Sequence, residues 1–286
     1  MRRKKILTFF ILFLMFLSGS LTFAGEVTRE EAIDVFFKAN EEYNAAQKEM
    51  AAKKEKEALE KFEHAARLYE KLLGSNFISG QIYYNLGNAY YRQGMAGRAI
   101  LHYRRAEKLL PRNADVKANI DLLKSDFEDK ESMRQMPEIL KIMCFWYFFL
   151  NINEITTLTI YMYLAFMASI LSIIFLRFQW LKNISTILAS CLFVLVISLG
   201  LMAYNQYSIE RGVVIADECE IRYGPGEEYE PKFEIHEGAE VKIEEERNKW
   251  YKVYVYVDVE SIRDNEEQKD MEFKKGWIPK AKVEKI

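Results

Sequence analysis

Residues 83–111 read YYNLGNAYYRQGMAGRAILHYRRAEKLLP, and this stretch decides the fold of the N-terminal part of the chain. Apolar and small residues recur in it at three- and four-residue spacing, which predicts two amphipathic helices. Gly94 is expected to end the first helix, because glycine readily adopts the left-handed conformation found there. Gly87 has no side chain and should let the second helix approach closely. We therefore expect a tightly packed helical hairpin.

Eight positions of this stretch occur in a fixed order of residue types: Tyr83, Leu86, Gly87, Tyr90, Ala99, Tyr103, Ala106 and Pro111. Together they resemble the tetratricopeptide repeat, a helical hairpin of about 34 residues. A degenerate earlier copy is expected to use Phe36, Ala39, Tyr43, Ala58, Phe62 and Ala65, with a connection about six residues longer than usual. A further helix after Pro111 would cap the stack, since a repeat cannot bury its face alone. Residues 25–130 are thus predicted to form an all-α domain of tetratricopeptide hairpins.

The polar face of the predicted first helices is a candidate groove for a partner. An asparagine amide both donates and accepts hydrogen bonds, so it can pair with a peptide unit without reading its side chain. In the repeat family, asparagines at these positions can hold an extended peptide by its backbone. The alternative is that these residues are solvated or belong to the repeat consensus. The candidate groove residues are Asn40, Tyr84, Asn85, Asn88, Arg92 and Asn119.

No catalytic or metal-binding constellation is evident in the sequence. The phosphate-binding loop, the zinc-protease helix, the nucleophile elbow and the dinucleotide fingerprint are all absent. His64 and His102 lie in predicted second helices with no ligand at metal spacing, so both are expected at the surface. The net charge of -2 gives no argument for nucleic-acid binding. We expect no enzyme activity, no metal and no cofactor.

Residues 1–24 have the pattern of a secretory signal peptide. A basic start is followed by an apolar run and by small residues, with cleavage expected after Ala24. The alternative is an uncleaved N-terminal anchor. Either form directs the following domain out of the cytoplasm.

Two uncharged runs, 158–176 and 184–203, are each long enough to cross a bilayer as a helix. The loop between them, 177–183, carries Arg177 and Lys182 and no acid, which favours the cytoplasmic side. Both soluble domains are then extracytoplasmic. The preceding segment, 137–150, is too short to span, and its aromatic residues predict an amphipathic helix lying at the membrane interface.

The C-terminal region, 212–286, has short β-branched and aromatic runs separated by turns, which predicts a small all-β domain. The order of its motifs resembles bacterial SH3-like domains, with Arg222, Gly224, Pro225, Glu237, Gly238, Trp250, Gly276, Trp277 and Ile278 at the matching positions. The resemblance implies a small barrel. Exposed aromatic candidates for capturing a peptide or cell-wall fragment are Tyr223, Tyr229 and Trp277. The alternative is that Trp250 and Trp277 fill the barrel core.

The complete order, signal, repeats, two spans and SH3-like domain, resembles the BatE-type proteins of the Bacteroides aerotolerance group. The resemblance implies a multidomain protein of the bacterial inner membrane that works with other Bat components. These components include von Willebrand A-type membrane proteins and a MoxR-type ATPase. The resemblance also implies a role in oxidative or envelope stress. From the residues themselves we infer a membrane-anchored scaffold that binds membrane or periplasmic proteins. A cell-wall module that binds peptidoglycan and an envelope enzyme with an unrecognised site are the alternatives.

Overall fold

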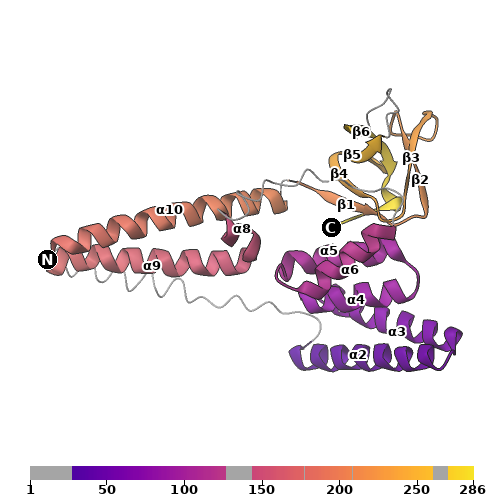
Figure 1. The fold of residues 1–286 in the computed structure, drawn as a ribbon, viewed down its shortest axis with the longest axis horizontal. Helices are drawn as coiled ribbons and strands as arrows, with labels where there is room; N and C mark the ends of the chain where they lie inside the picture. Colours follow the sequence, from indigo (N-terminus) through magenta and orange to yellow (C-terminus); the bar gives the residue numbers. More distant parts are fainter. Residues whose placement is uncertain (1–27, 127–143, 177, 208, 260–269) are drawn as a thin grey trace, which may run out of the picture.

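The computed structural model describes residues 28–126, 144–176, 178–207, 209–259 and 270–286. A stack of helices, a long helix pair and an antiparallel sheet make up these residues, and Figure 1 shows their arrangement. The stack and the sheet lie at the same end of the helix pair. The predicted signal peptide, 1–24, and residues 137–143 of the predicted interfacial helix lie outside the described residues.

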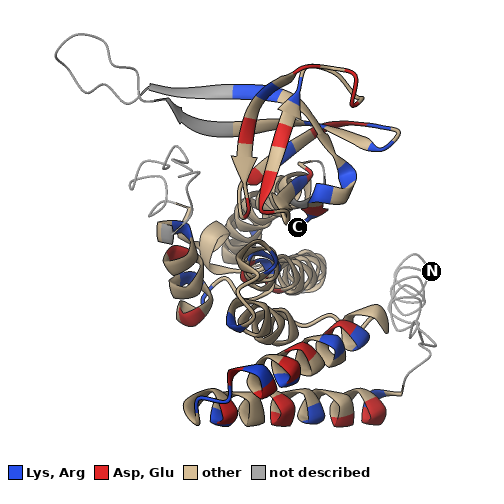
Figure 2. Cartoon of the chain, turned by 90° about the vertical axis from the view of Figure 1, so that its right-hand side faces the viewer, with Lys and Arg blue, Asp and Glu red and all other residues tan. Residues whose placement is uncertain are grey.

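The helical stack consists of two antiparallel hairpins and a capping helix. Its helices are α2 (Arg29–Ala51), α3 (Glu55–Gly74), α4 (Gly80–Arg92), α5 (Ala96–Leu109) and α6 (Ala114–Asp126). The first helix begins with a reciprocal cap, in which the Thr28 hydroxyl accepts from Glu31 N and the Glu31 carboxylate accepts from Thr28 N. Lys, Arg, Asp and Glu residues alternate along the outer surface of α2 and α3, as Figure 2 shows. The stack is therefore covered by a solvated, mixed-charge surface at its outer end.

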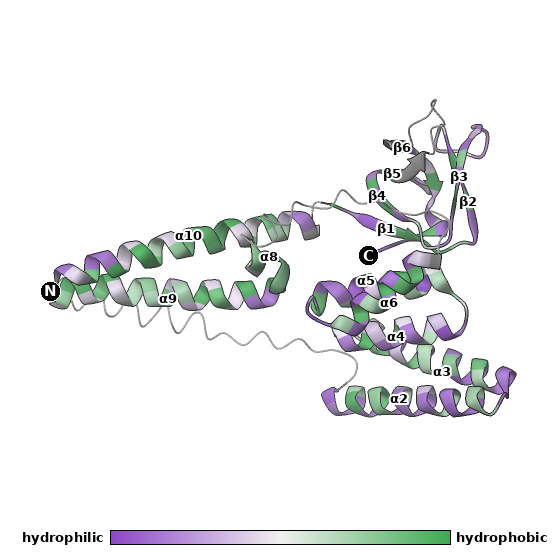
Figure 3. Cartoon of the chain, in the orientation of Figure 1, coloured by the Kyte–Doolittle hydropathy of each residue, from purple (hydrophilic) through white to green (hydrophobic). Residues whose placement is uncertain are grey.

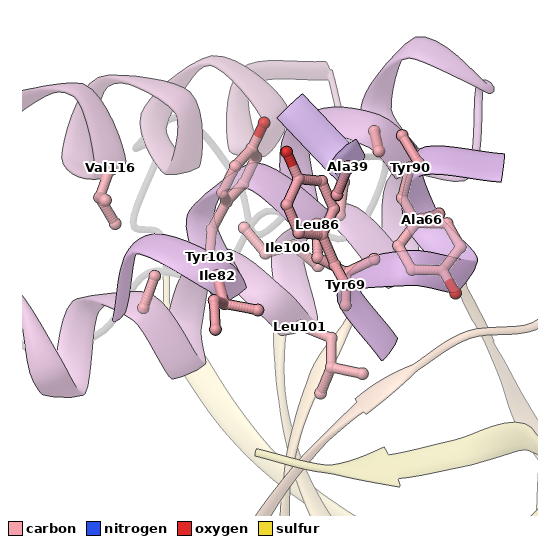
Figure 4. Packing of buried hydrophobic residues seen from close by; sticks show 14 of the residues in the cluster. Ala39, Ala66, Tyr69, Ile82, Leu86, Tyr90, Ile100, Leu101, Tyr103 and Val116 are labelled. Atoms are coloured by element: carbon pink, nitrogen blue, oxygen red, sulfur yellow. The ribbon is translucent and has the colours of Figure 1, made fainter. Parts of the chain in front are cut away.

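The second hairpin, α4 and α5, is the one that the sequence predicts in detail. Gly94 has a positive φ of 78°, as expected for a residue that ends a helix. A Cβ atom on Gly87 would lie 2.6 Å from ring carbons of Tyr103. The predicted close approach of the two helices at Gly87 is thus confirmed. Figure 4 shows the shared core, in which Leu86, Ile100 and Tyr103 are almost completely buried.

The first hairpin, α2 and α3, is longer than a standard repeat. Asn40 and Tyr69 form a hydrogen bond across it and are 29 residues apart, whereas the equivalent pair in the second hairpin, Asn88 and Tyr103, is 15 residues apart. The additional 14 residues extend both helices and bury a separate small core of Ala46, Ala58 and Phe62. The expected connection of about six extra residues is therefore wrong. Most of it is helical, because its Ala, Glu and Lys residues favour helix.

Helices α9 (Ile152–Leu176) and α10 (Gln179–Tyr207) pack against each other as a long antiparallel pair. Each is long and apolar enough to cross a membrane, and few of their residues are buried within the structure. Figure 3 shows apolar residues over most of their length. The hydroxyls of Ser169 and Ser185 lie 2.6 Å apart between the two helices. Because α10 begins at Gln179, most of the predicted loop 177–183 is helical.

A short helix, α8 (Phe145–Phe149), precedes the pair and lies beside α10. The indole Nε1 of Trp146 donates to the hydroxyl of Ser198 on α10, at 3.1 Å. Phe145, Phe148 and Phe149 are exposed. This short aromatic helix therefore packs on α10 directly before the chain enters α9.

The sheet domain is one antiparallel sheet with strand order β3-β2-β6-β5-β4-β1-β7. All seven strands contribute to a single core that includes Ile221, Ile235, Val253 and Ile278, so the sheet curves around its own interior. The sheet is nevertheless open, with β3 and β7 at its edges, and the expected closed barrel is not formed. The strands are β1 (Arg211–Val214), β2 (Glu218–Arg222), β3 (Pro231–His236), β4 (Glu240–Arg247), β5 (Trp250–Val259), β6 (Asp270–Pro279) and β7 (Val283–Lys285).

The sheet domain docks on α5. Val213 of β1 is completely buried in the core of the helical stack, and Leu101 of α5 lies on the side of the strands in Figure 4. A Cβ atom on Gly97 would lie 2.6 Å from the carbonyl oxygen of Val214, so the two backbones meet there without a side chain between them. The Gly97 N–H donates to the Glu237 carboxylate at 2.6 Å. The apolar core of the stack thus continues into the sheet domain.

A buried ionic cluster joins the same two domains. Glu240 of β4 is 8% exposed and lies 2.7 Å from the Arg104 guanidinium and 3.1 Å from Lys124 Nζ on α6. Burial opposes ionisation of Glu240, but the positive charges of Arg104 and Lys124 hold its pKa below the ordinary value. Glu240 therefore pairs with cations from two different helices, α5 and α6, and Arg104 also pairs with Glu107 at 2.7 Å.

We predict that Glu240→Ala lowers the free energy of unfolding by about 3 kcal/mol, because it removes a buried carboxylate that pairs with both Arg104 and Lys124. Chemical denaturation of the detergent-solubilised chain measures this change. Glu244→Ala on the same strand is the control. Its carboxylate pairs with Lys252 on the exposed surface, so its loss should change the free energy of unfolding very little. Equal effects of the two substitutions would contradict the structural role of the cluster.

Candidate partner-binding site

The predicted groove asparagines form a hydrogen-bonded ladder across α2, α4 and α6. In its first unit, the Asn40 carbonyl oxygen accepts from the Tyr69 hydroxyl at 2.6 Å and from Asn85 Nδ2 at 2.9 Å. Asn85 also accepts from Gln81 Nε2 at 2.9 Å. Apart from the bond between Gln81 and Asn85 within α4, each of these contacts joins the first helix of one hairpin to its own second helix or to the next first helix.

The second unit of the ladder repeats the first one. The Asn88 carbonyl oxygen accepts from the Tyr103 hydroxyl at 2.7 Å and from Asn119 Nδ2 at 3.0 Å. Tyr103 is buried, so Asn88 satisfies a hydroxyl that water cannot reach. The same geometry in successive hairpins fixes the spacing of the asparagine side chains along the stack.

The ladder leaves part of each amide available. Within the described part of the chain, Asn40 Nδ2, Asn88 Nδ2 and Asn119 Oδ1 form no hydrogen bond. The first two groups donate hydrogen bonds and the third accepts one. Each residue of an extended peptide, other than proline, carries a C=O and an N–H that can pair with them. The asparagines therefore have both a structural role and a remaining capacity to bind.

Tyr84 and Arg92 flank the ladder on α4. The ring of Tyr84 lies 6.0 Å from that of Tyr103 and is half-buried, whereas Arg92 at the end of the helix is exposed. Tyr91 beside it is also exposed. The asparagine ladder is thus flanked on α4 by the half-buried ring of Tyr84 and by two exposed side chains, Tyr91 and Arg92.

His102 is buried, so the expectation of a surface histidine is wrong. Its ring is stacked between Tyr83 and Tyr90, at centroid distances of 6.0 and 5.4 Å. Its Nδ1 has no hydrogen-bond partner within the described residues. Burial, together with the charges of Arg105 and Arg98, lowers the pKa of His102 to about 3. The side chain acts as a neutral member of the aromatic core between α5 and α4.

His64 lies partly at the surface of α3. It is half-buried, with its Nδ1 3.3 Å from the Glu42 carboxylate.

The three aromatic residues predicted as a surface site on the sheet domain differ in exposure. Tyr223 and Tyr229 are 64% and 44% exposed, so both are available at the surface. Trp277 is only 7% exposed, with the Arg247 guanidinium 5.4 Å from its ring centroid. The surface role predicted for Trp277 is therefore wrong, because this side chain packs into the sheet domain.

Sequence reasoning missed the contact between α5 and the sheet domain, including Gly97, Arg104 and Glu240. A signal was present, because α5 carries buried apolar residues at Ile100 and Leu101, outside the repeat positions.

The comparison with protein families supports the assignment of the second hairpin. A tetratricopeptide repeat model matches residues 80–113, which contain α4 and α5. A comparison with curated proteins finds no match. Tetratricopeptide repeats generally mediate binding between proteins. The helical region of this chain is thus similar to a known class of protein-interaction scaffold.

No cluster of three or more His, Cys, Asp or Glu side chains suited to a metal ion occurs among the described residues.

We predict that His102 makes the fold sensitive to acid. Its pKa falls from 6.5 in the unfolded chain to about 3 in the fold, so below pH 6.5 the unfolded state binds a proton that the folded state does not. Its stabilising contribution is complete above pH 6.5 and is lost progressively toward pH 3. Between neutral pH and about pH 5 the wild type should lose about 2 kcal/mol of stability through His102, and His102→Phe should not show this loss.

Denaturation curves of wild type and His102→Phe at several pH values measure this difference. His64→Phe is the matched control and should retain the acid sensitivity of the wild type, because it leaves the ring stack of Tyr83, His102 and Tyr90 unchanged. Parallel pH profiles for wild type and His102→Phe would show that His102 does not titrate as its burial requires.

Proposed function

We propose that the chain is a membrane-anchored scaffold that binds an extended segment of a partner protein along α2, α4 and α6. The observation that carries this proposal is the repeated asparagine ladder, which spaces backbone-pairing amides along the face formed by the first helices. The similarity of residues 80–113 to a protein-binding repeat supports it. The proposed role is binding without catalysis.

We also propose that α9 and α10 cross the bacterial inner membrane and that both soluble domains are extracytoplasmic. Arg177 and Lys182 lie in or near the short connection between the helices, where the rule that positive charge stays inside favours the cytoplasm. The docking of the sheet domain on α5 also requires the two domains to share one side of the membrane. These arguments use different residues and support the same topology.

The finer identity of the protein rests on the order of its segments. We propose that the sheet domain is an open relative of the SH3-like fold and that the scaffold works in a Bat-type aerotolerance or envelope-stress complex. The mainly antiparallel order of short strands and the turn residues Gly224, Pro225 and Gly238 support the first part. The order of repeats, spans and sheet domain supports the second.

Binding of peptidoglycan is a second candidate function because of two exposed tyrosines on the sheet domain. Tyr223 and Tyr229 lie at the same turn, and the Arg222 guanidinium donates to the Tyr229 carbonyl oxygen and orders this turn. Aromatic faces of this kind can stack on sugar rings. Sedimentation of the full chain with peptidoglycan, lost in Tyr223→Ala, would favour this function over protein binding.

The scaffold proposal predicts that the double substitution Asn85→Ala and Asn119→Ala weakens partner capture by about tenfold or more while the fold persists. Tyr69 and Tyr103 keep their acceptors on Asn40 and Asn88, so the stack should lose only about 1 kcal/mol per substitution. Crosslinking in membranes, followed by purification of the chain and quantification of the attached proteins, measures capture.

Arg67→Ala on the outer surface of α3 is the control and should not change capture. Unchanged capture by the double asparagine variant would overturn the groove proposal. Recovery of no membrane or extracytoplasmic protein with the wild type would overturn the scaffold proposal as a whole.

A further inference from the structure

A cavity of about 390 Å³ lies where the helical stack, the sheet domain and the helix pair meet. Its walls come from α5, α6, α8, the start of α9, the end of α10 and β1. This place is the junction at the end of the helix pair in Figure 1. For a chain anchored by α9 and α10, the cavity is at the depth where lipid headgroups lie.

The polar wall of this junction cavity is cationic. Lys108 of α5, Lys117 of α6 and Arg211 of β1 line it. Among the described residues that line the cavity, Glu107 alone has a carboxylate, and the Arg104 guanidinium pairs with it at 2.7 Å. Burial lowers the pKa of Lys108, and the nearby positive charges of Arg211 and Arg105 lower it further. Lys108 is therefore repelled by neighbouring positive charges, of which Arg211 also lines the cavity, and an anion between these cations would relieve that repulsion.

The opposite wall of the junction cavity is aromatic and apolar. It is formed by Tyr147 and Phe148 of α8, Ile152 of α9 and Met202 of α10. Aromatic residues commonly lie at the boundary between headgroups and hydrocarbon. A ligand that fits this site has a negatively charged end toward the soluble domains and an apolar end along the helix pair.

The walls are held together by contacts between the helical stack and the start of α9. The Arg112 guanidinium donates to both carboxylate oxygens of Glu154, at 2.6 and 3.2 Å. Its carbon lies 4.7 Å from the ring centroid of Phe149. Asn151 Nδ2 donates to the Leu109 carbonyl oxygen at 3.3 Å. A bidentate pair of this kind fixes orientation as well as distance, so the cavity is formed before any ligand arrives.

We propose that the junction cavity binds the phosphate-bearing headgroup of an anionic phospholipid, with Lys108, Lys117 and Arg211 around the phosphate and the acyl chains along α9 and α10. Basic pockets at the ends of membrane helices are suited to such headgroups. The proposal rests on the membrane anchoring proposed above. The bound lipid would fill the junction between the soluble domains and the membrane helices.

Lipid titration of the full-length chain tests this site. The detergent-purified chain is titrated with phosphatidylglycerol, phosphatidylcholine or inorganic phosphate, and native mass spectrometry measures the bound fraction. Phosphatidylglycerol should bind at least about tenfold more tightly than phosphatidylcholine, because it carries a net negative charge for the lysines and arginine. Inorganic phosphate should neither bind measurably nor displace the lipid at equal concentration.

The double variant Lys108→Gln and Lys117→Gln should lose the preference for phosphatidylglycerol. The matched control, Lys38→Gln and Lys48→Gln on α2, changes the net charge equally and should keep the preference. The proposal is overturned by a wild type without preference, by a cavity variant that keeps it, or by displacement with free phosphate. Cell fractionation distinguishes failure of the proposed membrane anchoring from failure of the lipid site. A chain found in the soluble fraction contradicts the anchoring. A membrane-bound chain without a preference for phosphatidylglycerol contradicts only the lipid site.

Discussion

The burial of α5 on both sides is the constraint on which the rest of the structure depends. One side packs on α4 around Tyr103, as in a repeat hairpin, and the other side receives Val213 of the sheet domain. Gly97 allows the strand backbone to approach, and Glu240 neutralises Arg104 at the edge of this contact. Apolar burial therefore supplies the attraction between the domains, while the buried charges require one specific docking position.

This arrangement connects the candidate groove to the helix pair α9 and α10 through short paths. The ladder ends at Asn119 on α6, and the same helix contributes Lys124 to the interdomain cluster and Lys117 to the junction cavity. At the start of α6, Arg112 binds Glu154 at the first turn of α9. A partner on the asparagine face, the sheet domain and a lipid at the junction would thus all act on α6, which makes this capping helix the natural place for coupling between them.

The features that depend on local spacing could be predicted from the sequence. Gly87 and Gly94 have the expected roles, because the helix packing and the helix end that require these glycines both lie within one repeat. The extended first hairpin was not foreseen, since extra helical turns preserve the apolar periodicity and are hidden by it. His102 was misplaced because its burial depends on how its ring stacks between Tyr83 and Tyr90 of the preceding helix, which the spacing of the repeat does not specify. For Trp277 the sequence left a surface role and a core role open, and its low exposure confirms the core role.

The most direct test of the account is a crosslink between α5 and the sheet domain in native membranes. Arg105 and Glu284 form an ion pair at 3.0 Å, so cysteines at these two positions should be joined by a short bifunctional maleimide. The chain for this experiment has Cys144 and Cys191 replaced by Ser, and a pair at Arg105 and Lys232 is the control. The account predicts rapid and nearly complete crosslinking of the first pair and little of the second. Absence of a crosslink at Arg105 and Glu284 would contradict the docking of the two domains.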